Sequence, residues 1–376
     1  MKQKTATDAA AAREQVIVKT SVIGIAANVL LVAFKAAIGL ASGSIAVILD
    51  AVNNLSDALS SVITILGAKL GAKQPNKKHP LGYGRIEYLS SMTVAAIVLY
   101  AGITSLVESV KKIIHPGAAD YTVTSLVIIA AAVVVKLILG AYVKKQGKQV
   151  DSGALIASGS DASFDAVLSA SVLASAVVFK LWGLSLEAYV GVVIAGFIIK
   201  AGVEMMIETL NDILGHRGDA ELVKSIKHLL TEDSDVQGAY DLVLFNYGPG
   251  KNYGSVHLEV PDVLTADEID RLTRRAQERV YAQTGVILTG VSIYSFNTQD
   301  EEIAAIRSRI QTAVLAHDWA LQLHGFYLDR EKMTIRFDVV ISFDVDHRQA
   351  LEELYREIKA EYPAYEFQII PDTDVS

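Results

Sequence analysis

Cysteine is absent from the 376 residues of the chain, which excludes disulfides and thiolate metal sites. Charged residues make up only 20% of the chain and hydrophobic residues 51%, a balance too apolar for an ordinary soluble domain. The sequence also lacks a tract of mixed basic and aromatic residues, and its formal net charge is -8. Nucleic-acid binding is therefore not expected.

Six long runs of Ala, Val, Ile, Leu and Gly stand out from the rest of the chain. Each is long enough to cross a hydrocarbon core about 30 Å thick as a helix. The polar start, MKQKTATDAAAAREQ, lacks the apolar core of a cleavable signal peptide, so we expect the first run to insert and remain. We predict a multi-pass α-helical membrane protein with a six-helix transmembrane bundle in residues 1–214. The runs lie near residues 16–40, 44–70, 88–110, 122–143, 154–180 and 184–210.

Basic residues are distributed unevenly around these runs. By the positive-inside rule, loops rich in Lys and Arg lie in the cytoplasm. An even number of spans then places both termini in the cytoplasm of a cell-membrane protein, although Lys111 and Lys112 after the third run oppose this topology. The basic residues after the second and fourth runs are Lys69, Lys73, Lys77, Lys78, Arg85, Lys144, Lys145 and Lys148.

Residues 215–376 differ in composition from the apolar part, with 16 Lys and Arg against 28 Asp and Glu. Their pattern predicts a cytoplasmic α+β ferredoxin-like domain over 215–298, in the order helix, strand, strand, helix, strand. The same order recurs over 299–376, which predicts a second unit of this kind in tandem. The expected elements are 219–231, 238–247, 253–261, 266–283, 287–296, 301–317, 321–329, 333–344, 350–362 and 365–372.

Two of the apolar runs carry clustered polar residues. In LDAVNNLSDALS, the spacing of Asp50, Asn53, Asn54 and Asp57 places all four on one helical face. In the fifth run, Asp161 and Asp165 share a face in the same way. Carboxylates at membrane depth are costly, and they normally face a bundle interior and mark an ion pathway. A small-residue helix interface held by Asn and Ser is the structural alternative.

The donor atoms of this predicted site are all oxygens. Such a set suits a hard divalent cation. All eight histidines lie outside the six runs, whereas zinc and copper usually recruit imidazole or thiolate. Manganese(II) is therefore favoured over zinc as the transported substrate, with magnesium and iron(II) left open.

Two other functions also use intramembrane carboxylates. An intramembrane aspartyl protease places two aspartates on different helices, but its Y-D and G-x-G-D motifs do not accompany Asp57 or Asp161. A channel or a magnesium carrier is the stronger rival, since an oxygen-only site fits either. Flux with or without proton counterflow would distinguish them.

The motifs together resemble the cation diffusion facilitator family. Their marks here are N-x-x-x-D at Asn53 and Asp57, D-x-x-x-D at Asp161 and Asp165, the loop HPLGYGRIE, and a ferredoxin-like tail, over roughly residues 15–298. The resemblance implies a homodimeric antiporter, not an enzyme, that expels a divalent cation in exchange for protons and uses no cofactor. The two motifs are similar to those of the bacterial manganese efflux branch, although iron(II), magnesium, cobalt and zinc remain alternatives.

Carried over residue by residue, the resemblance implies a transport site at Asn53, Asp57, Asp161 and Asp165. Asn28 and Asp50 are candidates for the pathway or for helix packing, and Arg85 and Asp212 for a pair near the membrane surface.

Accessory metal sites of the family would fall on two further groups of positions. The first group is Asn76, His79 and Tyr83, and the second is Tyr240, His257, Tyr294 and Phe296. These positions retain few metal ligands, so we expect both accessory sites to be lost. Lys35, Lys136 and Lys200 are expected to snorkel or to pair structurally.

Overall fold

The computed structural model describes residues 2–42, 45–115, 123–182, 186–215 and 219–373. Within the helices, the surroundings of some side chains, including those of Asp50 and Asn53, lie outside this description. Contacts divide the chain into two compact units. The first comprises Met1–Gly215 with Asn246–Lys251, and the second comprises His216–Phe245 with Asn252–Ser376.

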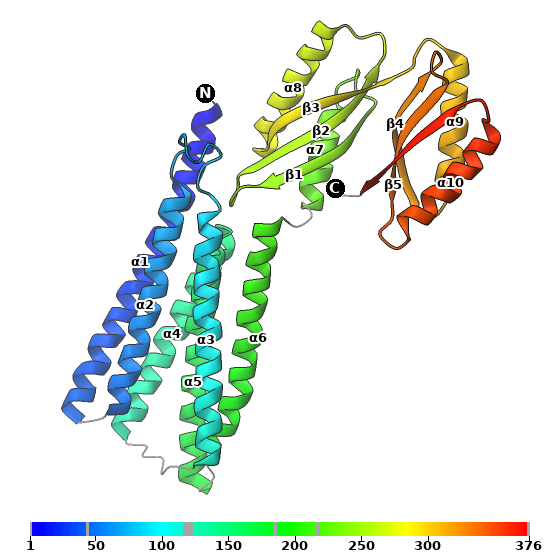
Figure 1. The fold of residues 1–376 in the computed structure, drawn as a ribbon. Helices are drawn as coiled ribbons and strands as arrows, with labels where there is room; N and C mark the ends of the chain where they lie inside the picture. Colours follow the sequence, from blue (N-terminus) through cyan, green and yellow to red (C-terminus); the bar gives the residue numbers. More distant parts are fainter. Residues whose placement is uncertain (1, 43–44, 116–122, 183–185, 216–218, 374–376) are drawn as a thin grey trace. The chain divides into compact units, whose positions relative to one another are not determined.

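Over its described residues, the first unit is built from six long helices (Figure 1). These match the six apolar runs, and each helix ends beyond the C-terminal end of the run that predicted it. They are α1 (Lys2–Ser42), α2 (Ile45–Gly71), α3 (Ile86–Ile114), α4 (Val123–Gln149), α5 (Gly153–Trp182) and α6 (Glu187–Leu214).

Four segments of these helices, over the described residues, are long and apolar enough to cross a membrane. They are Ala11–Ala37 of α1, Ile86–Ile114 of α3, Leu126–Gln149 of α4 and Ala188–Leu214 of α6. Many large apolar side chains on these helices are exposed, as expected of surfaces that face lipid. The chain is a multi-pass membrane protein, and the crossing of α2 and α5 stays a prediction.

Small residues let the helices approach closely, as in other membrane bundles. A Cβ atom added to Gly159 of α5 would lie 2.5 Å from the backbone nitrogen of Lys144 in α4. A Cβ atom on Gly202 of α6 would lie 2.9 Å from the Cα atom of Leu99 in α3. Glycine is therefore required at both crossings, and α4 packs on α5 and α3 on α6.

The second unit contains the predicted helix and strand order twice. Its helix and strand types and their order agree with the sequence prediction throughout. The first set is α7 (Ala220–Thr231), β1 (Gly238–Asn246), β2 (Asn252–Pro261), α8 (Ala266–Thr284) and β3 (Ile287–Phe296). The second set is α9 (Glu301–Leu315), β4 (Ala320–Asp329), β5 (Thr334–Ile341), α10 (His347–Glu361) and β6 (Glu366–Thr373).

Each set forms its own three-stranded sheet, in the order β1-β2-β3 and β4-β5-β6. In both sheets the last pair, β2 with β3 and β5 with β6, is parallel, because the helix between the two strands carries the chain back. Each sheet buries an apolar core against its helices, for example Leu258 with Leu272 and Phe337 with Leu354.

Local sequence signals fix the ends of these helices. Thr265 begins α8 with a capping box, in which its hydroxyl accepts from the Glu268 backbone nitrogen and the Glu268 side chain accepts from the Thr265 backbone nitrogen. Gly285 ends the helix with φ of 74°, a conformation that favours glycine. Asp300 and Asp346 cap α9 and α10 with their side-chain carboxylates, which accept from backbone nitrogens of the first helical turn.

Candidate metal-transport site

Carboxylates from two helices meet inside the first unit. Asp57 lies on α2, and Asp161 and Asp165 lie on α5, which packs on α2. Asp161 is buried, and Asp57 and Asp165 are partly buried. Helical spacing accounts for the pair on α5, whereas the meeting of α2 and α5 is a property of the packed bundle.

Lys136 of α4 joins the two helices. Its ammonium Nζ donates to Asp57 Oδ2 at 2.9 Å and also to Asp165 Oδ2. Lys136 is itself only 4% exposed, so its charge is held among these carboxylates instead of reaching the surface. Of the two roles expected for Lys136, snorkelling and pairing, the structure shows pairing.

Sequence reasoning did not place Lys136 in the site. A signal was present, because a lysine within VVVKLIL is an ionisable residue in an apolar run and such residues are functional candidates by default. Its partners, 79 and 29 positions away, are not indicated by that signal.

Asn28 lies beside the same site. It lines a narrow cavity together with Asp57, Ser21 and Ser61. Asn28 is 4% exposed, and its Oδ1 atom has no hydrogen-bond partner in the described part of the chain. A buried amide oxygen without a donor is costly, and a cation or its hydration water would satisfy it.

Asn54 is a further buried amide on α2. It is fully buried, and neither its oxygen nor its nitrogen finds a hydrogen-bond partner among the described residues. Asp50 and Asn53 lie on the same helix, but their side chains are outside the described residues. The part of the predicted site that the structure describes is therefore Asp57, Asp161 and Asp165, with Asn28 beside it.

The pair expected at the membrane surface stays a prediction. Arg85 donates from Nε and Nη2 to the Asn246 backbone oxygen, at 3.2 and 2.9 Å, within the first unit. Asp212 lies near the end of α6. A different ion pair, not predicted from the sequence, links α1 and α3: Arg13 donates to both oxygens of the buried Glu87 at 2.8 and 2.7 Å.

The loop positions of the first accessory site are engaged in a turn. The Asn76 side-chain oxygen accepts from the backbone nitrogens of Lys78 and His79, both at 2.9 Å. Its amide nitrogen donates to the Tyr83 hydroxyl at 2.7 Å. Hydrogen bonds within the loop thus account for Asn76 and Tyr83.

The second accessory region has more metal ligands than the sequence indicated. The rings of His257 and Tyr294 stack with their centroids 4.6 Å apart, and the rings of Tyr240 and His324 stack with their centroids 5.0 Å apart. Asp241, His324 and Asp338 meet at this place, and their possible ligand atoms lie within 4.8 Å of one another. Sequence reasoning missed these three because two of them belong to the second sheet, whose docking on the first is not indicated by local pattern.

A bundle of long apolar helices that gathers carboxylates in its interior defines an integral membrane protein that handles cations. The family of the cation efflux transmembrane domain matches residues 21–214, a little more than half of the chain. The chain belongs to this family, the cation diffusion facilitators, whose members are metal transporters and not enzymes.

Individual relatives agree with this assignment. An uncharacterized transporter of Methanocaldococcus jannaschii is 26% identical over 70% of this chain and 92% of its own length. The manganese efflux system protein MneP of Bacillus subtilis is 27% identical over 61% of this chain and 79% of its own. The magnetosome protein MamB of a Magnetospira species is 25% identical over 62% of this chain and 78% of its own.

Proposed function

We propose that the protein exports manganese(II) from the cytoplasm across the cell membrane in exchange for protons. In this proposal Asn53, Asp57, Asp161 and Asp165 bind the metal, and α2 and α5 cross the membrane with the other four helices. The observation that supports it most is the buried bridge of Lys136 between Asp57 and Asp165. Such a concentration of charge is costly to bury and fits a cation pathway.

The charges at the site suit a divalent cation. With all three carboxylates ionised, Asp57, Asp161 and Asp165 together with the Lys136 ammonium would carry an excess of two negative charges. One divalent metal ion or a pair of protons would neutralise the same excess. Metal and protons are therefore exclusive occupants, which is the requirement for exchange between them.

Lys136 supplies the counter-charge when the metal is absent. An ammonium bound to Asp57 and Asp165 limits the repulsion between these carboxylates. When a metal ion binds, the carboxylate oxygens turn from Lys136 to the ion, and Lys136 stays nearby as the fixed positive charge. Alternation of the bundle between inward- and outward-open states then exchanges the metal for protons from outside.

Manganese is favoured by ligand chemistry. Carboxylate and carboxamide oxygens suit manganese, whereas zinc usually recruits imidazole or thiolate. The manganese efflux proteins MneP and MneS, 27% and 26% identical to this chain, are consistent with this choice. Iron(II), magnesium, cobalt or zinc is the alternative cargo. An oxygen-rich site favours divalent cations as a class but discriminates less sharply between one divalent cation and another.

The proposal includes a homodimer with both termini in the cytoplasm. It divides the chain into a transmembrane domain, residues 1–214, and two ferredoxin-like units, 215–298 and 299–376, related by duplication. The repeated order of elements and the matching sheet orders support the duplication. Cysteine accessibility scanning tests the orientation, since the natural chain contains no cysteine that would interfere.

Transport by purified protein in liposomes tests the cargo. Manganese, iron(II), magnesium, cobalt and zinc are supplied singly and in competition, with a metal-sensitive dye inside. We expect manganese to enter fastest and to inhibit the other ions. Equal or faster entry of another ion would assign that ion as the cargo and would leave the site assignment to be tested by substitution.

A further inference from the structure

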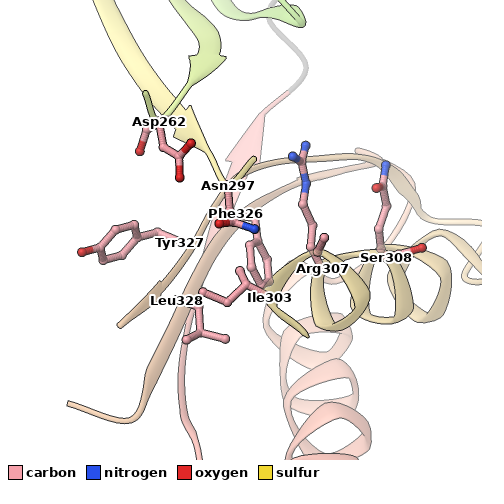
Figure 2. Close-up of a pocket in the computed structure, with 11 residues that line it drawn as sticks. Asp262, Asn297, Ile303, Arg307, Ser308, Phe326, Tyr327 and Leu328 are labelled. Carbon is pink, nitrogen blue, oxygen red and sulfur yellow. The ribbon is translucent and has the colours of Figure 1, made fainter. Parts of the chain in front are cut away.

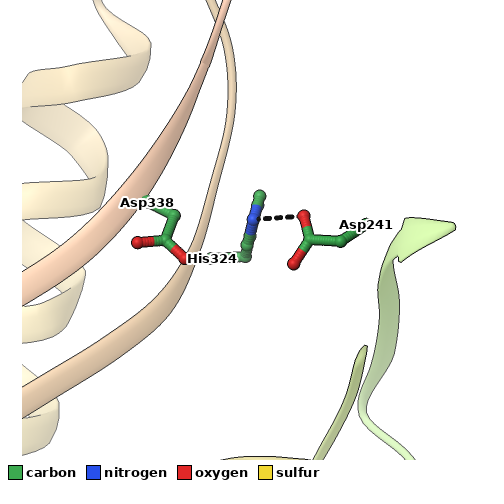
Figure 3. Close-up of side chains that lie close together, drawn as sticks. All are labelled: Asp241, His324 and Asp338. Carbon is green, nitrogen blue, oxygen red and sulfur yellow. Dashed lines mark ion pairs between the residues drawn. The ribbon is translucent and has the colours of Figure 1, made fainter. Parts of the chain in front are cut away.

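Two charged places in the second unit are paired within that unit. A hollow of about 360 Å³ is lined by residues of α9 and both sheets (Figure 2), and its Arg307 donates to Glu259 Oε1 at 2.7 Å. In the second accessory region, His257 Nδ1 and His324 Nε2 each lie 2.8 Å from a carboxylate oxygen of Asp241 (Figure 3). These side chains already have their counter-charges, so neither place requires a ligand.

Three lysines near the end of α4 are different, because they lack such counter-charges. Lys144, Lys145 and Lys148 line a shallow hollow on the surface of the first unit, together with Ala141 and Gln149. None of the three lysines forms an ion pair with a residue that the structure describes. Their positive charges are therefore available to an anionic ligand.

Helical spacing brings the three ammonium groups to one face of α4. Lys144 and Lys145 lie four and three residues before Lys148, so each is about one turn from it. Gly147 faces α5, since a Cβ atom added to it would lie 2.8 Å from the backbone nitrogen of Ile156. Lys145 is two residues from Gly147, about 200° around the helix, and therefore points away from α5.

The same face of α4 is apolar before it reaches the lysines. Val134 is 57% exposed and Ile138 is 68% exposed. A line of residues in steps of three and four runs along this face, through Val134, Ile138, Ala141, Lys145 and Lys148. An exposed apolar surface thus leads directly to a group of positive charges.

The length of α4 indicates where the lysines lie in a membrane. The apolar segment Leu126–Gln149 contains 24 residues. About 20 residues of helix cross the hydrocarbon core, so a core that begins at Leu126 ends near Lys145. The apolar line then faces acyl chains, and the lysines lie at the depth of the lipid phosphates.

We propose that this face of α4 binds an anionic phospholipid, with its phosphate at Lys144, Lys145 and Lys148 and an acyl chain along Val134 and Ile138. Basic side chains at the membrane surface attract anionic lipids, and here three of them converge without a carboxylate to neutralise them. The inference requires only that the protein spans a membrane, and it does not depend on which metal is transported.

Two other ligands match this face less well. A second copy of the chain would meet it through a two-fold contact, in which the same patch faces itself. The lysines of one copy would then oppose the lysines of the other. Free phosphate would satisfy the ammonium groups but would leave the apolar line uncovered. A phospholipid matches both parts of the face.

Lipid binding by the full-length protein in an uncharged detergent tests the proposal. Phosphatidylglycerol and phosphatidylcholine with identical acyl chains are titrated separately without metal, and bound lipid is counted by native mass spectrometry. We expect phosphatidylglycerol to bind at least about tenfold more tightly. Lys145→Gln with Lys148→Gln should weaken phosphatidylglycerol binding by at least about tenfold and leave phosphatidylcholine binding unchanged.

The matched control is Lys111→Gln with Lys112→Gln. It removes the same charge from the last turn of α3, but these two residues are consecutive and point about 100° apart, so they do not form one face. This control should bind phosphatidylglycerol normally. Lys145→Arg with Lys148→Arg, which keeps the charge, should also bind it normally. Lys148→Gln alone, with a smaller loss, replaces the pair if the pair does not fold.

Three results would overturn the proposal. Equal losses in the two glutamine pairs, or no loss in either, would show that any attraction is diffuse. Binding of free glycerol phosphate as tight as that of the lipid would assign the lysines to a soluble anion. Dissociation of a dimer by Lys145→Gln with Lys148→Gln, without loss of lipid, would assign the face to a second copy.

Discussion

The ammonium of Lys136 lies 2.9 Å from Asp57 Oδ2, and it also bonds to Asp165, so one lysine of α4 links α2 with α5 inside the bundle. This contact places one positive charge among the carboxylates of the metal-free site and so limits their mutual repulsion. It also predicts that a metal ion and Lys136 compete for the same oxygens.

Replacement of Lys136 tests that competition. Lys136→Met removes the counter-charge of a buried pair, which commonly costs about 3–5 kcal/mol in stability. Because manganese supplies the missing positive charge, it should raise the unfolding temperature of this variant more than that of the wild type. Lys200→Met is the control, since Lys200 is exposed and lies 3.6 Å from Glu204 on the same helix. An equal manganese shift in Lys136→Met and wild type would contradict the proposed competition.

Neutral substitutions at the carboxylates should abolish transport. Asp57→Asn, Asp161→Asn and Asp165→Asn each remove a charged oxygen that water cannot replace, and flux should fall at least as far as the roughly 10–100-fold loss seen for supporting groups. Glu204→Gln is the control, because Glu204 lies on the exposed surface of α6, and this variant should transport manganese normally. Near-normal flux in any two of the three aspartate variants would show that the site assignment is wrong.

Histidine in place of oxygen donors should change the selectivity. Asn53→His with Asp161→His introduces the nitrogen ligands that zinc prefers. We expect manganese flux to fall and zinc binding or transport to rise relative to it. The measurement is a competition flux assay with both ions, and an unchanged manganese-to-zinc ratio would show that these residues do not set selectivity.

Arg13 should stabilise the bundle through Glu87. Removal of the guanidinium leaves a buried carboxylate unpaired, so Arg13→Ala should cost about 3–5 kcal/mol. Glu87→Gln in the same chain should recover much of this loss, because the amide carries no charge. Thermal unfolding of the two single variants and the double variant measures the coupling. Strict additivity would mean that the two side chains act independently.

The sequence predicted the long helices and the ten elements of the second unit well, because both depend on local pattern. Apolar runs long enough to cross a membrane predict helices, and the order of short helical and strand patterns predicts the elements of the second unit. The pair Asp161 and Asp165 follows from helical spacing alone. These features require no knowledge of which elements touch.

The contacts between distant elements were not predictable in this way. Lys136 lies 79 positions from Asp57, and their meeting depends on how α4 packs against α5 and α5 against α2. His324 and Asp338 could be placed opposite each other once β4 and β5 were recognised, but not against Asp241 of another sheet. Docking of the two sheets determines that contact, and its signals are spread over many side chains.

Manganese and proton movements recorded together in the same liposomes test the central claim most directly. A proton gradient, acidic on the side to which manganese is delivered, should drive manganese against its own gradient while protons move the opposite way, detected by a metal dye and a pH dye. A protonophore collapses the proton gradient and should therefore abolish the uphill movement of manganese, and Asp161→Asn should show neither manganese transport nor coupled proton movement. Manganese flux that proceeds without proton counterflow would contradict antiport and indicate a channel or uniporter, and uphill manganese movement that survives the protonophore would contradict coupling to the proton gradient.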